Sequence, residues 1–444
     1  MAMVVKNNMS ALSTLNTLNK NTNALSKSLQ KVSSGMKINS AADDASGYAI
    51  SERMRVQIRS LDQANSNAQN GGSMMKVAEG AVSSTVDILK TLKEKAVNAA
   101  NDTNTDADRQ TIQKELDQSI DQINDNANVT FNGQYLVDGS KNSKTVGTST
   151  ALTNQSLAEG TAMSDTLISL AARNGDKLNI QSTDTVTVSW VKDGKTYTAS
   201  TLVGSTQTLA DILGSSSTLK TASSHALSAD LKLVGEKTSF IALDGSGNSV
   251  YTASGESALS ITSKGTGIEN QISGFTISIT DNTGAVRKSA NAALDAFDET
   301  LRAQNKSDDN SINLQIGTKA NQTIKVGLTD MKAQALGLQG KDNSTLQVGN
   351  QEQANAAINV LDAAIQKALD QQTTIGAVQS RLEYTQNNLT TASENVTAAE
   401  STIRDADMAK EMTEYTKNNV LMQAAQSMLA QANQSSSNVL SLLQ

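Results

Sequence analysis

The sequence lacks cysteine and proline altogether and contains a single histidine, His225. Without cysteine the chain has no disulfides, no thiol chemistry and no thiolate metal sites. One histidine cannot complete a motif that needs two, such as HExxH. Average usage would place about 22 prolines in a chain of this length. Because proline breaks helix interiors, its absence is typical of long helices, and it also removes the slow X-Pro isomerisation step from refolding.

Aromatic residues are scarce as well: there are one tryptophan, six tyrosines and four phenylalanines, and only Tyr48 precedes residue 130. A large globular core normally relies on aromatic bulk, so the first part of the chain must pack through aliphatic side chains. The net charge of −7 provides no basic field for binding nucleic acid. No catalytic constellation can be assembled around His225, and we expect no enzyme activity and no cofactor.

Long hydrophobic runs are also missing. No run of 18 apolar residues is present, so no membrane insertion is expected. The opening letters MAMVVKNNMS contain too short an apolar stretch for a secretory signal peptide. We therefore expect a protein that stays in the cytoplasm or leaves by a route without a cleaved signal.

Composition divides the chain into three parts. Residues 1–130 and 350–444 are rich in Ala, Asn, Gln, Leu and Ser, whereas residues 141–310 are rich in Ser, Thr and Gly and alternate with period two. We predict a mainly α fold with a β-rich outer region. The N- and C-terminal segments form a long antiparallel helical bundle, and the Ser/Thr/Gly-rich centre forms a β-containing domain.

Both outer parts carry an apolar residue at every seventh position, which is a coiled-coil-like signal. In the second part the companion positions turn polar from Gln372 to Glu400, which favours a bundle helix over an isolated two-stranded coil. We expect Gly71-Gly72 to bend the first long helix or thin its packing. The predicted seam consists of Met54, Leu61, Met75, Val82 and Leu89 in the first part, and Leu361, Ile375, Leu382, Leu389, Val396 and Ile403 in the second.

Acidic residues mark the predicted helix starts. Asp43-Asp44 precedes a helix near Ala45, where a cap is a better interpretation than a paired acid and base. Thr105–Asp108 is the expected cap of a third helix that ends near Asn128. The stretch from Asp102 resembles half of a calcium loop, but Ala107 and Gln113 replace the required glycine and glutamate, so no metal site is expected.

The two ends of the chain carry apolar stripes without a neighbour in sequence to cover them. We expect these helices to pair with each other and with identical neighbours, because head-to-tail contacts between copies generate open helical filaments. The candidate polymerisation residues are Leu18, Leu25, Leu29, Val32 and Met36 at the start, and Leu421, Ala425, Met428, Ala432, Val439 and Leu442 at the finish.

The middle of the chain is predicted to contain β-hairpins. Trp190 alternates with valines on a strand and is expected in the core of the outer domain, whereas His225 lies in a polar stretch and is expected at the surface. The predicted hairpins are Phe131–Gly139, Thr185–Ser200 with a turn at Asp193-Gly194, Phe275–Ser289 and Ile312–Leu328.

Several long motifs carry a resemblance to the bacterial flagellin family. LQKVSSGMKINSAADDASGYAISERMRVQIRSL (Leu29–Leu61) is similar to that family's amino-terminal signature, and the segment Thr390–Gln444 is similar to its carboxy-terminal signature. FNGQYLV, LQIGTKANQTIKV and DMKAQALGL resemble its inner hairpin region. The resemblance covers about 1–140 and 310–444, and it leaves the middle without a match.

The resemblance implies a structural subunit that self-assembles into the helical flagellar filament used for swimming. It implies three domains: 1–44 with 403–444 as the inner coiled coil, 45–140 with 310–402 as a rod, and 141–309 as a variable outer domain. It also implies unfolded export by a type III route and assembly at the distal tip. The implied partners are the export apparatus, a chaperone on about Asp405–Gln444, the cap and the hook-junction proteins.

The family's receptor-contact helix, which Toll-like receptor 5 recognises, maps onto Leu89–Asn98. The usual Arg-x-Arg-Glu-Leu appears here as Thr91-Leu92-Lys93-Glu94-Lys95, and the acidic contact further on matches Glu115. Because the first arginine is replaced by Thr91, a bidentate donor is lost, and Lys95 puts a charge where leucine is usual. The resemblance therefore implies weakened recognition by that receptor.

Three other hypotheses compete with the filament subunit. The first is a junction or cap-proximal protein of the same appendage, which would share the terminal helices. The second is a subunit whose outer domain cleaves peptides, although the zinc version is excluded by the lone His225. The third is a secreted adhesin whose middle region binds glycans or a host surface.

Overall fold

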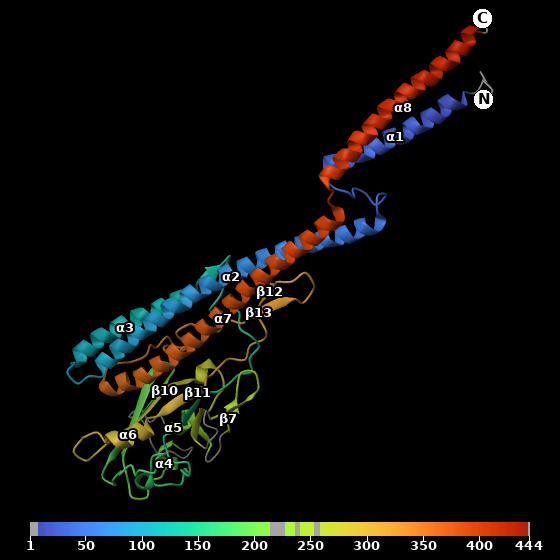
Figure 1. The fold of residues 1–444 in the computed structure, drawn as a ribbon. Helices are drawn as coiled ribbons and strands as arrows, with labels where there is room; N and C mark the ends of the chain where they lie inside the picture. Colours follow the sequence, from blue (N-terminus) through green and yellow to red (C-terminus); the bar gives the residue numbers. More distant parts are fainter. Residues whose placement is uncertain (1–7, 214–226, 236–239, 253–257, 443–444) are drawn as a thin grey trace. The chain divides into compact units, whose positions relative to one another are not determined.

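The computed structural model describes residues 8–213, 227–235, 240–252 and 258–442. The chain forms two compact units, which are described separately. The first unit comprises Met1–Gln69, Gln315–Gln322 and Tyr384–Gln444, and the second comprises Asn70–Leu314 and Thr323–Glu383. Long helices dominate the parts of the chain nearest its ends, and strands are concentrated in the middle (Figure 1).

The first unit contains an antiparallel pair of helices, α1 (Met9–Ser34) and α8 (Met408–Leu442) (Figure 1). Helix α1 starts at Asn8, whose side chain accepts a hydrogen bond from the Ala11 amide, and ends at Gly35 in the left-handed conformation, a common helix terminator. Asparagine side chains tie the two helices together at three levels, which establishes their direction: Asn8 to Ala432 O (3.3 Å), Asn21 to Leu421 O (3.2 Å) and Asn418 to Ser28 Oγ (3.0 Å).

Two longer helices, α2 (Ala45–Ala99) and α7 (Gln351–Arg404), contribute to both units. The start of α2 confirms the capping interpretation of Asp43-Asp44. The Asp44 carboxylate accepts hydrogen bonds from the Ser46 and Gly47 amides at 3.0 Å each. The Asp43 carboxylate accepts from the amide of Ser40, and this hydrogen bond lowers the pKa of Asp43.

Helix α2 runs without interruption through Gly71-Gly72. The pair therefore does not end the helix, and Gly71 instead allows a close approach: a Cβ there would lie 2.7 Å from Leu314 Cδ1. Helix α3 (Asp106–Ala127) follows with the expected cap, in which Thr105 and Asp108 exchange side chain-to-backbone hydrogen bonds. In the second unit the buried positions of α2, α3 and α7 are almost entirely aliphatic or alanine.

Two short hairpins appear where the sequence predicts them. The first joins β1 (Thr130–Phe131) to β2 (Gln134–Tyr135). Its turn residues Asn132 and Gly133 both have positive φ, the geometry of a tight hairpin turn. The second hairpin joins β12 (Ile312–Gln315) to β13 (Thr323–Val326).

The middle of the chain forms three further sheets in the second unit. One has the order β10-β4-β5, the next β11-β3-β9-β6, and the last pairs β7 with β8. The strands are β3 (Ala151–Asn154), β4 (Thr185–Lys192), β5 (Lys195–Leu202), β6 (Leu231–Gly235), β7 (Phe240–Leu243), β8 (Ser249–Tyr251), β9 (Leu259–Ser263), β10 (Ile272–Thr280) and β11 (Phe297–Leu301). Short helices α4 (Leu209–Leu213), α5 (Leu227–Asp230) and α6 (Lys288–Leu294) accompany them, with 3₁₀ turns at Leu167–Ser169 and Ile268–Asn270.

The β4–β5 hairpin confirms the prediction for Thr185–Ser200. Asp193 and Gly194 occupy the turn with φ values of 51° and 71°. The predicted Phe275–Ser289 hairpin is wrong, because β10 pairs with β4 and the chain after the turn makes a single bridge, Thr280 with Val286, before it enters α6. Asn291 on α6 accepts from the Ile279 amide at 2.7 Å, so a helix rather than a strand satisfies this edge of β10.

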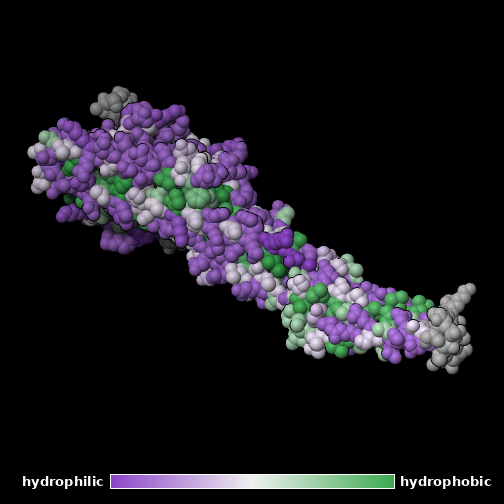
Figure 2. Space-filling view, turned by 90° about the horizontal axis from the view of Figure 1, so that it is seen from above, coloured by the Kyte–Doolittle hydropathy of each residue, from purple (hydrophilic) through white to green (hydrophobic). Residues whose placement is uncertain are grey.

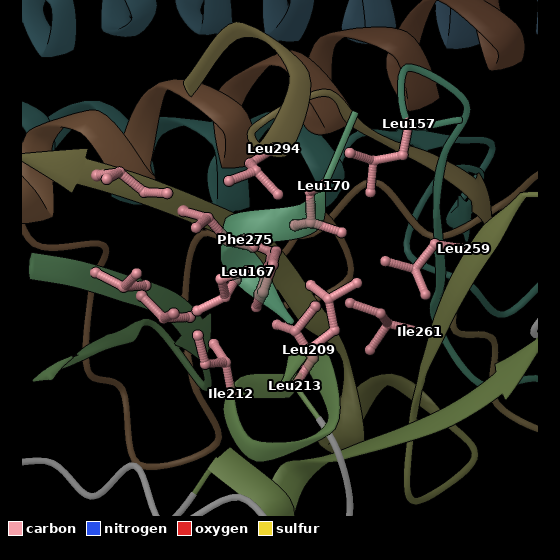
Figure 3. Packing of buried hydrophobic residues seen from close by; sticks show 14 of the residues in the cluster. Leu157, Leu167, Leu170, Leu209, Ile212, Leu213, Leu259, Ile261, Phe275 and Leu294 are labelled. Atoms are coloured by element: carbon pink, nitrogen blue, oxygen red, sulfur yellow. The ribbon is translucent and has the colours of Figure 1, made fainter. Parts of the chain in front are cut away.

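An aliphatic and aromatic cluster of the second unit lies among these sheets and short helices (Figure 3). Trp190 is completely buried and stacks on Tyr197 with ring centroids 5.6 Å apart, which confirms its predicted core role. Leucines and isoleucines from the loops, α4 and β9 converge on Phe275 (Figure 3). His225 lies outside the described residues.

Gly274 sets how closely strand β10 approaches helix α7. A Cβ at this position would lie 2.6 Å from Val360 Cγ2 and 2.9 Å from the Ala356 carbonyl oxygen. We predict that Gly274→Ala destabilises the second unit by about 1–3 kcal/mol, because the backbone of α7 cannot yield to the added methyl group. Thermal unfolding followed by Trp190 fluorescence measures the change. Gly160→Ala is the matched control, because its Cβ would meet nothing within 4 Å, and equal stability of the two variants would contradict the prediction.

Candidate self-association surface

The outward side of the α1–α8 pair exposes large apolar side chains. Leu29 is 52% exposed, Leu421 42% and Met428 62%. Hydrophobic patches interrupt the polar surface over this pair in Figure 2. Further exposed apolar residues on the same two helices are Met9, Leu12, Leu15, Met408, Met412 and Val420. Exposed apolar groups in this number on one helix pair are typical of a protein interaction surface.

The other stripe residues lie between the two helices. Ala425 and Ala432 are buried, and Leu18, Leu25 and Val32 are half-buried. Met36 is half-buried at the end of the pair, where its sulfur accepts a hydrogen bond from Arg404 at 3.2 Å. The predicted stripe therefore divides into an inward set and the outward set Leu29, Leu421 and Met428. Val439 and Leu442 lie outside the residues whose side chains the structure describes.

An apolar hollow of about 640 Å³ lies between α1 and α8 near the open end of the pair. Leu12, Leu15 and Leu429 line it, and the polar residues Asn8 and Asn433 stand at its edge. Leu12 and Leu15 are 51% and 41% exposed, so this hollow leaves them largely in contact with solvent. The helix pair thus lacks a third element that would cover its apolar side chains among the described residues.

Arg404 stabilises the junction between the α1–α8 pair and the parts of α2 and α7 that belong to the first unit. Its guanidinium is buried, donates to Glu52 Oε1 at 2.6 Å and lies 5.4 Å from the centre of the Tyr48 ring. The backbone beside it closes a short antiparallel bridge, in which the Lys37 amide donates to Arg404 O and the Ala406 amide to Gly35 O. No local sequence pattern marks Arg404 for this role, because its partners Glu52 and Tyr48 are more than 350 positions away in the chain.

The predicted rod seam is buried in its central part. Leu61, Met75, Val82 and Leu89 on α2 are buried, and so are Leu361, Ile375 and Leu382 on α7. Met54, Leu389, Val396 and Ile403, which all belong to the first unit, are half-buried. The polar residues at the companion positions also make contacts between the helices: Gln379 on α7 donates a hydrogen bond to Glu79 on α2 at 2.7 Å.

The residues at the predicted receptor contact are partly engaged within the chain. Lys95 forms an ion pair with Glu115 at 2.9 Å, and Lys93 forms one with Asp362. Thr91 and Glu94 are exposed on α2. Glu115 therefore already has a cationic partner, Lys95, within the chain.

Neither metal nor membrane features stand out in the described part of the chain. Among those residues no cluster of three histidine, aspartate or glutamate side chains could hold a metal ion. No described helix combines the length and hydropathy that crossing a membrane requires. The arrangement of long aliphatic helices, with apolar side chains left exposed on the antiparallel pair formed by the two ends of the chain, is typical of a self-associating, coiled-coil structural protein.

Comparison with known proteins agrees with this class. The bacterial flagellin N-terminal helical region matches residues 5–142, and the bacterial flagellin C-terminal helical region matches residues 358–443. A flagellin of Clostridium tyrobutyricum is 35% identical over 434 residues, covering 97% of this chain and 99% of that protein. A flagellin of Bacillus subtilis is 32% identical over 461 residues, covering 99% and 100%. The chain belongs to the bacterial flagellin family: it is a structural subunit of the extracellular flagellar filament and not an enzyme.

Solved structures overlap with this chain only loosely. The flagellar hook-associated protein 3 of Legionella pneumophila aligns with a TM-score of 0.34 at 14% identity, covering 79% of this chain and 98% of that one. FliC from Burkholderia pseudomallei aligns with a TM-score of 0.25 at 19% identity, covering 70% and 99%. Overlaps this low carry no weight in the assignment.

The Arg404–Glu52 ion pair predicts a pH-dependent stability of the first unit. The hydrogen bond from Arg404 lowers the pKa of Glu52 below its ordinary value. The pair therefore stabilises the fold above the pKa of the unfolded state, about 4.3, and this stabilisation disappears as the pH falls through the lower folded-state pKa. We predict that Glu52→Gln lowers stability at pH 7 and removes this part of the acid sensitivity.

Urea unfolding of the monomer between pH 7 and pH 3, followed by circular dichroism, checks the prediction. Glu394→Gln is the matched control, because Glu394 is exposed on α7 in the same unit. The outcome against the prediction is an unchanged pH profile in Glu52→Gln, or an equal change in both variants.

Proposed function

We propose that α1 and α8 supply the surface through which copies of this chain polymerise. One observation carries this proposal: a pair of helices buries one side of each member, yet Leu29, Leu421 and Met428 remain 42–62% exposed on the other side. Burial of such side chains contributes about 1.5–3 kcal/mol each. Identical copies offer the same apolar side chains to one another, and repeated heterologous contacts build an open helical filament.

The inward set supports assembly indirectly. Leu18, Leu25 and Val32 on α1 are half-buried and Ala425 and Ala432 on α8 are buried, so this set stabilises the helix pair that presents the outward set. The rod-seam residues of α2 and α7 act in the same way, since their burial fixes the long helices that copies would align side by side. We propose that the inward and outward sets together serve polymerisation at the distal tip of a growing filament.

Export in an unfolded state fits the composition of the chain. Without proline, refolding after passage through a type III channel avoids slow X-Pro isomerisation, and without cysteine it avoids misplaced disulfides. We propose that a chaperone covers about Asp405–Gln444 before export, because Met412, Val420 and Leu421 in this segment are exposed. Cap and hook-junction proteins would meet the same terminal helices at the two ends of the filament.

Substitution of the outward set tests the polymerisation surface. We predict that Leu29→Gln combined with Met428→Gln raises the critical concentration for growth on filament seeds by more than tenfold, because two apolar contacts between copies are lost. Electron microscopy and sedimentation measure the polymer. Ser33→Gln combined with Ser427→Gln is the matched control, since both serines are exposed on the same helices. Normal growth of the first variant, or an equal defect in the control, would contradict the proposal.

We also propose that recognition by Toll-like receptor 5 is weakened in this chain. The Lys95–Glu115 ion pair occupies the acidic side chain, and Thr91 offers no bidentate donor. A variant with Thr91→Arg and Lys95→Leu restores the first and last positions of the family pattern, keeps Lys93 in place of the second arginine, and frees Glu115 from its ion pair.

This variant should bind the receptor ectodomain about tenfold more tightly, because each restored charged contact is worth 1–3 kcal/mol. Surface plasmon resonance with monomeric protein measures the affinity. Thr111→Arg on α3 controls for added positive charge. No gain in affinity, or the same gain in the control, would refute the proposal.

A further inference from the structure

The methionines of this chain differ sharply in their exposure to solvent. In the described part of the chain, every methionine that is exposed lies on α1 or α8: Met9 (68%), Met408 (43%), Met412 (45%) and Met428 (62%). The methionines of the second unit are all buried, namely Met74, Met75, Met163 and Met331. The thioether groups most open to solvent therefore belong to the helix pair that carries the candidate self-association surface.

Three other methionines of the first unit are less open. Met54 on α2 and Met422 on α8 are half-buried. Met36 is also half-buried, and its sulfur accepts a hydrogen bond from Arg404 Nε at 3.2 Å, which engages a lone pair of the thioether. A reagent that attacks sulfur from solvent should therefore reach the four exposed methionines of α1 and α8 first.

The exposed methionines lie towards both ends of the helix pair. Met9 lines the apolar hollow together with Leu12 and Leu429, and Met428 directly precedes Leu429 on α8. Met408 and Met412 are four residues apart at the opposite end of α8, so they lie on the same side of that helix. Sulfur is thus present at both ends of the surface that the pair offers.

Thioether sulfur is the most readily oxidised group on this surface. The chain has no cysteine, and its single tryptophan, Trp190, is completely buried. With hydrogen peroxide, a sulfur lone pair attacks a peroxide oxygen: an S–O bond forms, the O–O bond breaks and water leaves. Sulfur loses two electrons and peroxide gains them. The product, methionine sulfoxide, is polar where the thioether was apolar.

We propose that Met9, Met408, Met412 and Met428 are oxidation sites at which a peroxide prevents free subunits from polymerising. This inference rests on the proposed function, because the added oxygen matters only if copies of the chain bury these side chains. A sulfoxide oxygen that is buried without a donor weakens such a contact. Subunits already in a filament are protected, since their neighbours cover the same sulfurs, and enzymatic reduction of the sulfoxide reverses the block.

Treatment of the full-length monomer with hydrogen peroxide, which catalase then removes, tests the proposal. Peptide mass spectrometry should find sulfoxide at the four exposed methionines before it appears at Met75 or Met331, which are buried. The critical concentration for growth on filament seeds should rise by about tenfold or more, because several contacts between copies become polar. Methionine sulfoxide reductases A and B, which together reduce both sulfoxide epimers, should restore growth.

Leucine substitution separates the effect of sulfur from that of the apolar side chain, because leucine has a similar volume and does not react with peroxide. Each variant is compared with itself before oxidation, so that any effect of the substitution alone cancels. The test variant, which should lose the response to peroxide, combines Met9→Leu, Met408→Leu, Met412→Leu and Met428→Leu. Met163→Leu combined with Met331→Leu is the matched control and should retain the response, since both side chains are buried in the second unit.

Preformed filaments treated in the same way distinguish this proposal from the polymerisation surface itself. Equal oxidation of monomer and filament would contradict the surface, and the oxidation proposal would fall with it. Protection in the filament together with normal growth of oxidised monomers would overturn the oxidation proposal alone. A response that persists in the test variant, that disappears in the control, or that the reductases do not reverse would also overturn it. If the test variant does not assemble, the reductase measurement on the unchanged chain decides.

Discussion

The structure depends on one constraint: a pair of helices can bury only one side of each member. In the α1–α8 pair, alanines at 425 and 432 and half-buried leucines occupy the inner side, while Leu29, Leu421 and Met428 remain in solvent. A third element would normally cover them. Under the proposal made above, another copy supplies this cover, and the apolar surface that makes the isolated pair incomplete would also drive filament assembly. The same constraint accounts for the low charge of the C-terminal helix, in which the last charged residue is Lys417.

The long helices and the sheet region bury different kinds of side chain. Long helices with a seven-residue repeat bury Leu61, Met75, Leu361 and Ile375 without aromatic residues. The sheet region, which must enclose a core from short strands and loops, uses Trp190, Phe275 and Phe297 instead. Aliphatic seams between helices depend on repeated spacing, whereas a core enclosed by short strands depends on the shapes of individual side chains. This division agrees with family matches confined to residues 5–142 and 358–443.

Local sequence patterns do not predict interactions between ionisable groups that lie far apart in the chain. Arg404 meets Glu52 and Tyr48, and Lys367 on α7 is partly buried near Asp330 and Glu299, where loss of water around its ammonium group lowers its pKa to about 8. Each is an ordinary charged residue in the sequence, and only the fold gives it a partner or removes its water. The hairpin predicted for Phe275–Ser289 does not form, for a related reason. Its alternation and turn residues indicate a hairpin, but β10 pairs with β4 on one side, and on the other side its Ile279 amide donates a hydrogen bond to Asn291 on α6.

The sequence alone determined the helices, their caps and the apolar stripes, because these depend on spacing within one segment: Asp44 and Thr105 begin helices where they stand, and the heptads of α2 and α7 need no distant partner. It also determined the family, through long local motifs. Only the tertiary structure decided which stripe residues face inward, how Lys95 engages Glu115, and how Arg404 meets Glu52 and Tyr48. Those outcomes depend on which segments approach one another, and no periodicity within a segment encodes that.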